Sequence, residues 1–347
     1  MNILHAISGS DFGGTESAFE RIVTALLPCD VAQCVIIRAN DERAARLKKA
    51  GLEPVQLPFR TRFDFSSKRR LQAEINTFGP DLIVSWTPDV AGLMDPRPVK
   101  HIGFVGQDFP LAKYQSCDHL FTLTPQRRER AVSASWPADK ITILPPIIPS
   151  GDVDAIDRKR WFTPATGKLL VVVARLEPEH GINVLMEAVA RISGLYLWVV
   201  GDGSKRKEYE DVALELGIKP RTRFVGWRHD VPQIIAAADL VICPSRTDDI
   251  GVTVLEAWAR GKPVIAADAV GPGLLIKHRE TGVLVPIADA RSLSEAIKWV
   301  LRDPDFSMRI AAGGARTFAE SHAPEHVLPK YLKFFRSLLE PAAQSPT

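Results

Sequence analysis

Short apolar runs alternate with helical patterns along almost the whole chain of 347 residues, and this alternation limits the possible folds more than any other feature. In the first half, the expected strands are 3–7, 33–38, 53–57, 82–85, 101–105, 119–122 and 141–144, and the expected helices are 16–26, 42–50, 68–78 and 125–133. A second series of expected strands comprises 168–173, 196–200, 223–225, 240–243, 264–267 and 283–285. Alternation of this kind produces a mostly parallel sheet with helices on both faces. The sequence therefore predicts an α/β protein.

A segment rich in proline, glycine and charge separates the two series within residues 149–164. A chain of this length is too long for one ordinary core and suits two domains. We expect two Rossmann-like, doubly wound domains, at 1–155 and 156–322, which face each other across a ligand-binding cleft. The last segment, 323–347, contains a helix whose broad apolar stripe predicts packing against the body of the protein. A helix lying on a membrane is the alternative, because this helix also carries Lys330, Lys333 and Arg336.

Composition excludes several classes of function. The formal net charge of +3 gives no support to a nucleic-acid partner. The four cysteines show no metal-binding spacing, so we expect a reduced, cytoplasmic environment and no metal site. The start, MNILHAISGS, enters a strand directly and lacks the basic region of a signal peptide. No apolar run approaches the roughly 18 residues of a membrane span.

Two acidic residues stand beside one helix start in the segment 244–264. Asp248 lies on the loop after strand 240–243, and Glu256 lies in the first turn of a helix expected to open near Thr253. Free N–H groups and the helix dipole favour anions there. Two alternatives stay open: Thr253 and Glu256 also fit a capping box, and Asp248 also fits an ordinary turn. A ligand with both phosphates and hydroxyls, such as a sugar nucleotide, would suit the acid pair.

Two glycine-containing loops follow expected strands. Gly13 and Gly14 precede the first helix, where they allow close approach of a ligand or simply form a tight turn. Gly201 and Gly203 follow strand 196–200. Neither segment completes G-x-G-x-x-G, so a dinucleotide fingerprint is missing from the sequence.

Two cationic residues follow the first strand of the second series. Arg175 lies just beyond strand 168–173, and His180 lies five residues later. A guanidinium at the carboxyl end of a parallel strand suits a diphosphate, because it binds in a bidentate manner and keeps its charge. The alternative for Arg175 is a salt bridge to Glu177 or Glu179, and His180 alone could be a helix-start residue without a role.

Together these motifs resemble the family 4 retaining glycosyltransferases, which have the GT-B architecture. The carriers, in order, are FGGTES, ARLEPEHGI, VVGDGS, FVGW, PSRTDDIGVTVLEAWARGKPVIA and TGVLVP. The E-x7-E pattern of the family appears here as D-x7-E, from Asp248 to Glu256. His180 replaces a lysine, Gln107 and Asp108 stand where the family often has a histidine–aspartate pair, and PPIIPS replaces an asparagine-glycine-valine-aspartate turn.

The resemblance implies a role for each matching residue. Glu256 would hold the nucleotide ribose, and Asp248 would contact hydroxyls of the transferred sugar. Arg175 and His180 would bind the diphosphate. The other implied donor-binding residues are Gly13, Gly14, Gly201, Gly203, Gly226, Trp227, Ile250, Gly251, Val252 and Thr253. The implied catalytic set is Asp248, Arg175, His180, Gln107 and Asp108.

The reaction implied by the resemblance is metal-independent hexose transfer with retention. The donor would be a nucleoside-diphosphate sugar, with UDP-sugars favoured and GDP-mannose next, and no cofactor is expected. The acceptor would be a cell-envelope glycan or glycolipid such as lipopolysaccharide. The basic and aromatic segment 57–71 is either a solvated loop or a patch for anionic headgroups at the cytoplasmic face of the inner membrane. The alternatives are a sugar-nucleotide epimerase of the same architecture, a glycosyltransferase-like protein with reduced activity, and a solute-binding protein, which would need export.

Overall fold

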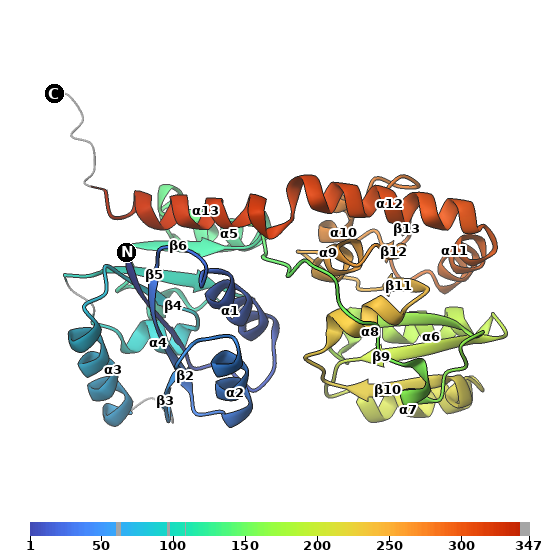
Figure 1. Cartoon of the computed structure of the whole chain (residues 1–347), viewed down its shortest axis with the longest axis horizontal. Coiled ribbons are helices and arrows are strands. Elements are labelled where there is room, and N and C mark those ends of the chain that lie inside the picture. Colours follow the sequence, from blue (N-terminus) through green and yellow to red (C-terminus); the bar gives the residue numbers. More distant parts are fainter. Residues whose placement is uncertain (60–63, 96–97, 108, 341–347) are drawn as a thin grey trace. The chain divides into compact units, whose positions relative to one another are not determined.

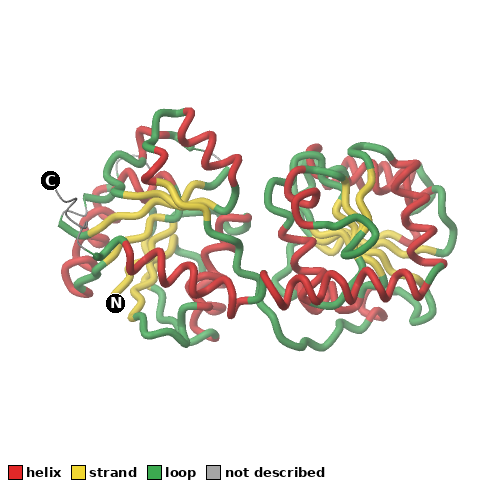
Figure 2. Tube along the Cα trace, turned by 90° about the horizontal axis from the view of Figure 1, so that it is seen from above, coloured by secondary structure: helices red, strands yellow, loops and turns green. Residues whose placement is uncertain are grey.

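The computed structural model describes residues 1–59, 64–95, 98–107 and 109–340. The chain forms two compact units, one from Met1–Ile147 together with Pro324–Thr347, and one from Ile148–Ala323. In each unit, helices cover both faces of a parallel sheet (Figures 1 and 2). The α/β fold with two Rossmann-like domains that the sequence predicts is therefore confirmed.

The described part of the first unit contains a seven-stranded parallel sheet in the order β3-β2-β1-β4-β5-β6-β7. Its strands are β1 (Asn2–Ile7), β2 (Ala32–Arg38), β3 (Val55–Leu57), β4 (Leu82–Ser85), β5 (Lys100–Val105), β6 (His119–Thr122) and β7 (Ile141–Ile143). Its α-helices are α1 (Gly14–Ala25), α2 (Asp41–Lys49), α3 (Phe65–Phe78), α4 (Pro88–Leu93), α5 (Pro125–Ser133) and α13 (Pro324–Ser337).

The second unit contains a six-stranded parallel sheet in the order β10-β9-β8-β11-β12-β13. Its strands are β8 (Lys168–Val173), β9 (Leu195–Val200), β10 (Thr222–Gly226), β11 (Leu240–Cys243), β12 (Val264–Ala267) and β13 (Val283–Val285). Its α-helices are α6 (Ile182–Ala190), α7 (Arg206–Glu215), α8 (Val231–Ala237), α9 (Val252–Ala259), α10 (Val270–Leu275), α11 (Ala290–Arg302) and α12 (Pro304–Ser321).

The strand order fixes where each unit can hold a ligand. In both sheets the chain first builds outward on one side of its first strand and then returns to the other side. The direction reverses between β1 and β4 in the first unit, and between β8 and β11 in the second. Ligands of doubly wound folds bind at the carboxyl ends of the strands beside such a reversal. The loops after β1, β4, β8 and β11 therefore lie where a ligand of each unit would bind.

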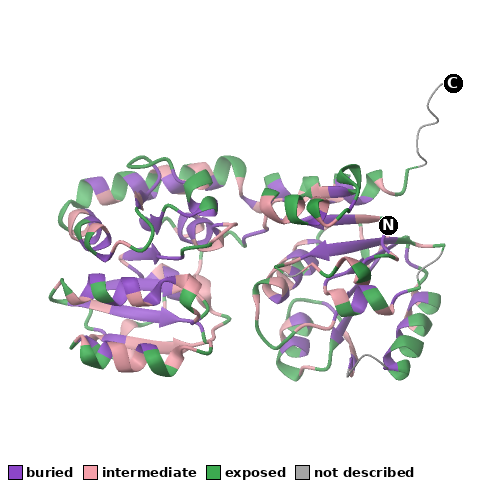
Figure 3. Cartoon of the chain, turned by 180° about the vertical axis from the view of Figure 1, so that it is seen from behind, coloured by how far each residue is buried: buried purple, intermediate pink, exposed green. Residues whose placement is uncertain are grey.

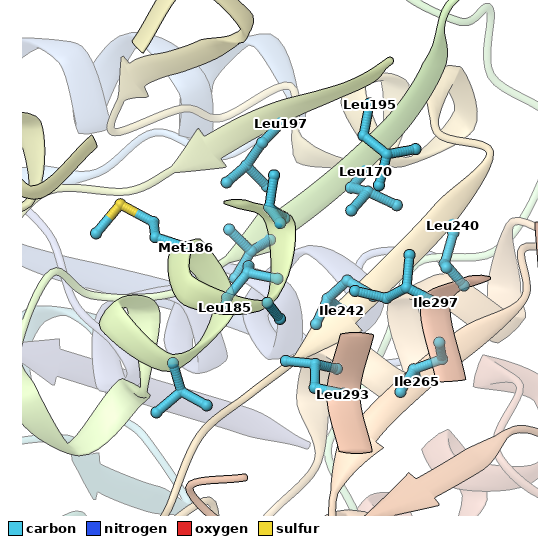
Figure 4. Close-up of a cluster of buried hydrophobic side chains, with 14 of the residues drawn as sticks. Leu170, Leu185, Met186, Leu195, Leu197, Leu240, Ile242, Ile265, Leu293 and Ile297 are labelled. Carbon is cyan, nitrogen blue, oxygen red and sulfur yellow. The ribbon is translucent and has the colours of Figure 1, made fainter. Parts of the chain in front are cut away.

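The central strands are buried on both faces, as the burial colours of Figure 3 show. In the second unit, α6 and α11 pack their apolar sides on the sheet, and Figure 4 shows this core with Leu185 of α6 and Ile297 of α11. Covering both faces of the sheet explains why the strands consist of nearly continuous apolar residues.

Helix α13 belongs to the first unit, although the chain reaches it only after completing the second. The rings of Tyr331 and Phe334 contact Phe121 of β6, with centroid distances of 6.3 Å and 6.1 Å. The Tyr331 hydroxyl donates to the carbonyl of Pro145 at 2.9 Å. Among the described residues, no helix is both long and apolar enough to cross a membrane.

The division between the units falls before Ile148, which is earlier than the expected boundary after residue 155. Ile148 is buried in an apolar cluster of the second unit. The guanidinium of Arg260 donates to the carbonyls of Pro149 and Gly151. These contacts attach the start of the connecting segment to the second unit.

Candidate functional site

The loops that follow β8 and β11 are fastened to each other in the second unit. The amide of Arg246 donates to the carbonyl of Glu179 at 2.8 Å. An added Cβ at Gly181 would lie 2.2 Å from the carbonyl oxygen of Pro244, so only glycine allows this approach. The two loops therefore form one continuous surface at the reversal point of the sheet.

Helix α9 begins at Val252, one residue before the expected start near Thr253. Its N-cap is Gly251, which has a φ of 74° and provides no side-chain cap, so Thr253 and Glu256 do not form the capping box that was one of the two alternatives for them. Thr253 is already inside the helix, and its hydroxyl donates to the carbonyl of Val173 at 3.3 Å. Glu256 falls in the second turn and is only 8% exposed. Capping therefore gives no reason for a buried glutamate at this position.

Asp248 forms a turn with the residues that follow it. Its Oδ1 accepts hydrogen bonds from the amides of Ile250 at 3.0 Å and Gly251 at 2.8 Å. Its carbonyl accepts from the amide of Gly271, at the start of α10, at 2.8 Å. These contacts are those of a turn residue, which was the alternative interpretation of Asp248. The amides of Ile250 and Gly251, which the resemblance assigns to donor binding, already donate to Oδ1 of Asp248.

Electrostatic effects show that the acidic and cationic residues share one neighbourhood. Burial, reinforced by the charges of Asp248 and Glu256, raises the pKa of the Cys243 thiol at the end of β11. Burial and then the charge of Arg175 lower the pKa of His180, while Asp248 acts in the opposite direction. The structure therefore brings Arg175, His180, Asp248 and Glu256 together at one edge of one sheet.

Arg175 forms a salt bridge with Glu179, which is one of the two partners that the sequence offered as an alternative to a diphosphate. Its Nη2 lies 3.7 Å from Oε1 of Glu179, and its side chain is 46% exposed. Glu177 instead accepts from the amide and hydroxyl of Ser204, at 2.8 Å and 2.6 Å. Exposed ion pairs contribute little stability, so an incoming diphosphate could replace Glu179 as the partner of the guanidinium at small cost.

His180 occupies the more buried position of the two candidate cations. Its Nδ1 lies 3.3 Å from the hydroxyl of Ser245. Its Nε2 is buried and has no hydrogen-bond partner among the described residues. Buried polar atoms are nearly always paired, so an unmet nitrogen in a ligand-type location is consistent with a missing ligand atom.

The glycines after β9 have a packing explanation. An added Cβ at Gly201 would lie 1.9 Å from the carbonyl oxygen of Ala174, and one at Gly203 would lie 2.6 Å from that of Leu176. These glycines allow the loop after β9 to pack on the loop after β8. Gly226 has a φ of 75° at an irregular end of β10, and Trp227 follows it in a half-buried position.

In the first unit, an acidic side chain in the first turn of α1 lies against the loop after β1, and it is not among the site residues predicted from the sequence. The carboxylate of Glu16 is buried between two glycines: an added Cβ would lie 2.2 Å from its Oε1 at Gly9 and 2.1 Å from its Oε2 at Gly13. The hydroxyl of Ser10 donates to Oε1 at 3.2 Å. Gly14, in contrast, has open space around the Cβ position. An acidic residue in the first helical turn after a glycine N-cap is the sequence pattern that could have indicated Glu16.

The same loop is held by a buried arginine, which is also not among the site residues predicted from the sequence. Arg43 of α2 is 1% exposed, and its Nη2 donates to the carbonyls of Ser10 at 2.7 Å and Asp11 at 3.2 Å. Its Nε donates to Glu20 of α1 at 3.0 Å. Nothing in the sequence distinguishes this arginine from the solvent-exposed basic residues of α2.

Gln107 lies on the loop after β5, next to the start of α1. An added Cβ at the preceding Gly106 would lie 3.2 Å from Oγ1 of Thr15, and the guanidinium of Arg130 donates to the Gln107 carbonyl. Asp108 lies outside the described residues. No group of histidine, cysteine and acidic side chains in the described ranges could hold a metal ion.

The basic and aromatic segment is described only in part. Arg60, Arg62 and Phe63 lie outside the described residues. On α3, Phe65 is 77% exposed, and Lys68, Arg69 and Arg70 are also exposed.

Comparison with known proteins shows the family to which the chain is related. The model of the family "Glycosyl transferases group 1" matches residues 153–317. The lipopolysaccharide core biosynthesis glycosyltransferase LpsE of Rhizobium meliloti is 30% identical over 97% of this chain and 99% of its own length. The chain belongs to the group 1 glycosyl transferases. LpsD of the same organism, also a lipopolysaccharide core biosynthesis glycosyltransferase, is 28% identical over 96% of this chain and 98% of its own.

The fold of this group 1 glycosyltransferase also matches a solved structure. The structure of HepE from Anabaena, in complex with UDP-glucose, superposes with a TM-score of 0.83 over 97% of this chain and all of HepE, at 19% identity. At that identity the likeness establishes the fold, which is GT-B. The predicted membership in this class of glycosyltransferases is confirmed.

Proposed function

We propose that this glycosyltransferase is a retaining, metal-independent enzyme. It moves a hexose from a nucleoside-diphosphate sugar to a hydroxyl of a cell-envelope glycan or glycolipid such as lipopolysaccharide. A UDP-sugar is the favoured donor, with GDP-mannose next. The observation that carries the proposal is the convergence of Arg175, His180, Asp248 and Glu256 at the reversal point of the second sheet.

Each of these side chains suits one part of such a donor. The buried carboxylate of Glu256 can accept hydrogen bonds from both ribose hydroxyls, and it is not used for helix capping. Arg175 and His180 can meet the diphosphate, since one is permanently charged and the other has an unmet buried nitrogen. The side chain of Asp248 can meet a sugar hydroxyl. The acceptor hydroxyl would then attack the face from which the diphosphate leaves, which gives retention.

The same residues support a reaction without a metal ion. Charge accumulates on the diphosphate as the bond to the sugar breaks. Arg175, a protonated His180 and the amino end of α9 can stabilise this charge where it develops. We therefore infer that chelators leave the rate unchanged.

The relatives support the identity of donor and acceptor. HepE is seen with UDP-glucose, which favours a uridine donor here. LpsE and LpsD act in lipopolysaccharide core biosynthesis, which favours an envelope glycolipid acceptor.

A donor screen tests the proposal. The protein is incubated with UDP-glucose, UDP-galactose, GDP-mannose and ADP-glucose, with and without EDTA, and release of the nucleoside diphosphate is measured. We expect slow release from one donor, unaffected by EDTA and strongly reduced in Glu256→Gln. Release of no nucleoside diphosphate from any donor, together with no binding of UDP or GDP, would overturn the proposal. Epimerised sugar nucleotide without release would instead indicate the epimerase alternative.

We further propose that the enzyme works at the cytoplasmic face of the inner membrane and contacts it through α3. An exposed phenylalanine beside exposed basic residues suits the interface of an anionic bilayer. Co-sedimentation with phosphatidylglycerol vesicles should be lost in Arg69→Glu/Arg70→Glu. The matched control, Lys48→Glu/Lys49→Glu on α2 of the same unit, makes the same charge change at exposed positions and should still bind. Equal sedimentation of both variants, or none by the wild type, would refute the contact.

A further inference from the structure

We propose that the two carboxylate oxygens of Asp248 have separate tasks: Oδ1 holds the amides of Ile250 and Gly251, and Oδ2 meets the transferred sugar. The first task makes Asp248 a positioning residue for the start of α9. The second task rests on the proposed function.

The contacts of Asp248 divide the carboxylate into two halves. Oδ1 accepts from the amides two and three residues further along the chain. The described residues offer no hydrogen bond to Oδ2. A carboxylate in such a turn uses one oxygen for the backbone and leaves the other for a second partner.

The turn is clamped from a second side. The amide of Gly271 donates to the carbonyl of Asp248. An added Cβ at Gly271 would lie 2.6 Å from the amide nitrogens of both Ile250 and Gly251, and one at Gly251 would lie 2.6 Å from Cδ1 of Leu275. The chain 248–251 therefore has one well-defined path against α10, and that path determines where α9 begins.

The turn also indicates which amides a diphosphate can use. Ile250 and Gly251 already donate to Oδ1, whereas Val252 and Thr253 are the first two residues of α9, where amides lack acceptors within the helix. We expect the amides of Val252 and Thr253 to donate to the diphosphate, while the amides of Ile250 and Gly251 continue to donate to Oδ1 of Asp248. Of the four donor-binding residues that the family resemblance implies in this segment, 250–253, only the last two would then have amides available to the diphosphate.

The length of its side chain explains why an aspartate, and not a glutamate, forms this turn at position 248. An asparagine has an oxygen at the same position as Oδ1 and can form the same turn. A glutamate keeps the charge, but its extra methylene group moves the oxygens away from the two amides. Asp248→Asn therefore keeps the Oδ1 task and replaces the charged acceptor Oδ2 by an uncharged N–H donor, whereas Asp248→Glu removes the Oδ1 task.

Hydrogen exchange tests the positioning task without any ligand. We expect the amides of Ile250 and Gly251 to be protected in the wild type and in Asp248→Asn, and to exchange about 3–10 times faster in Asp248→Glu, as suits the loss of one net hydrogen bond. Gly271→Ala, which presses on the same amides and leaves the carboxylate intact, should also accelerate their exchange. Unchanged protection in Asp248→Glu, or lost protection in Asp248→Asn, would overturn this half.

Binding tests the sugar task. In Asp248→Asn, UDP should bind at least as tightly as to the wild type, while UDP-glucose should lose about tenfold in affinity relative to UDP. In Asp248→Glu both ligands should weaken together, because the start of α9 is displaced. Asp249→Asn, which removes the neighbouring charge, controls for electrostatics and should leave the ratio unaltered. An unchanged ratio in Asp248→Asn would overturn the sugar task. If the wild type binds neither UDP nor UDP-glucose, the uridine donor is refuted and the same comparison is made with GDP and GDP-mannose; if these do not bind either, the proposed function and the sugar task fail together, and the exchange result still decides the positioning task.

Discussion

The carboxylate of Glu16 occupies the space in which a side chain at Gly13 would begin, because an added Cβ there would lie 2.1 Å from Oε2. Gly13 is the N-cap of α1, and Glu16 lies three residues further along. The negative charge therefore lies at the positive end of the helix, where it is stabilised by the dipole and the free amides.

We expect Gly13→Ala to lower the free energy of unfolding by about 1–3 kcal/mol, the usual cost of overpacking a buried site. Urea titration followed by circular dichroism measures the change. Gly14→Ala is the matched control: its Cβ has open space and alanine favours a helix, so stability should stay the same or rise slightly. A Gly13→Ala variant as stable as Gly14→Ala would show that Glu16 moves away without cost.

Arg43→Lys should lower the free energy of unfolding by about 2 kcal/mol, because a lysine cannot keep the guanidinium's bonds to Glu20 and to the carbonyls of Ser10 and Asp11. Hydrogen exchange should accelerate in the loop after β1. Arg46→Lys tests the more exposed partner of Glu20 and should cost less than about 1 kcal/mol. Equal effects of both changes would contradict a special role of the buried arginine.

Glu256→Gln should weaken binding of UDP about 10- to 100-fold, because hydrogen bonds to a charged acceptor are the stronger kind. Isothermal titration calorimetry measures the affinity. Thr253→Ala, which removes the bond to Val173, should lower stability by about 1 kcal/mol with little effect on the ribose contact. Unweakened UDP binding by Glu256→Gln would remove Glu256 from the ribose site.

The affinity for UDP should fall as the pH rises. Burial and then the charge of Arg175 hold the pKa of free His180 below its usual 6.5, against the opposing effects of Glu179, Asp248 and Glu177. A bound diphosphate raises this pKa, so binding takes up a proton. The affinity therefore decreases from below pH 6.5 upward until the pH passes the raised pKa of the complex.

The test is His180→Lys, which carries its charge throughout this range and should show a flatter profile between about pH 5.5 and 8.5. Glycosyl transfer or donor hydrolysis should be retained or faster. Calorimetry in buffers of different ionisation enthalpy counts the protons taken up. An inactive His180→Lys enzyme, or a profile as steep as that of the wild type, would show that His180 does not serve the diphosphate.

The sequence was sufficient for the fold because both sheets are parallel and covered. Strands such as Leu240–Cys243 are buried at every position, so they stand out as short apolar runs between helical patterns. The family motifs then indicated the loops at the reversal point, and the structure places Arg175, His180, Asp248 and Glu256 there.

The sequence does not indicate several contacts between distant segments. Thr253 looked like an N-cap because a glutamate follows it, but its hydroxyl instead meets Val173, eighty residues earlier in the chain. Gly201 stays a predicted donor-binding residue, and the structure adds a packing reason for a glycine there, because an added Cβ would meet the carbonyl oxygen of Ala174. Local patterns carry no information about which neighbour will compete for a hydroxyl or fill the space beside a glycine.

The return of α13 to the first unit has a consequence for biosynthesis. A ribosome delivers residues 148–323 before it delivers Tyr331 and Phe334, so the unit that is started first is finished last. Until then Phe121 of β6 keeps the rings of Trp86 and Phe104 but lacks those of α13, and the apolar surface left uncovered makes a nascent chain prone to aggregation. We expect premature termination before residue 324 to yield a folded second unit joined to an incomplete first one, and docking of α13 to complete the first unit.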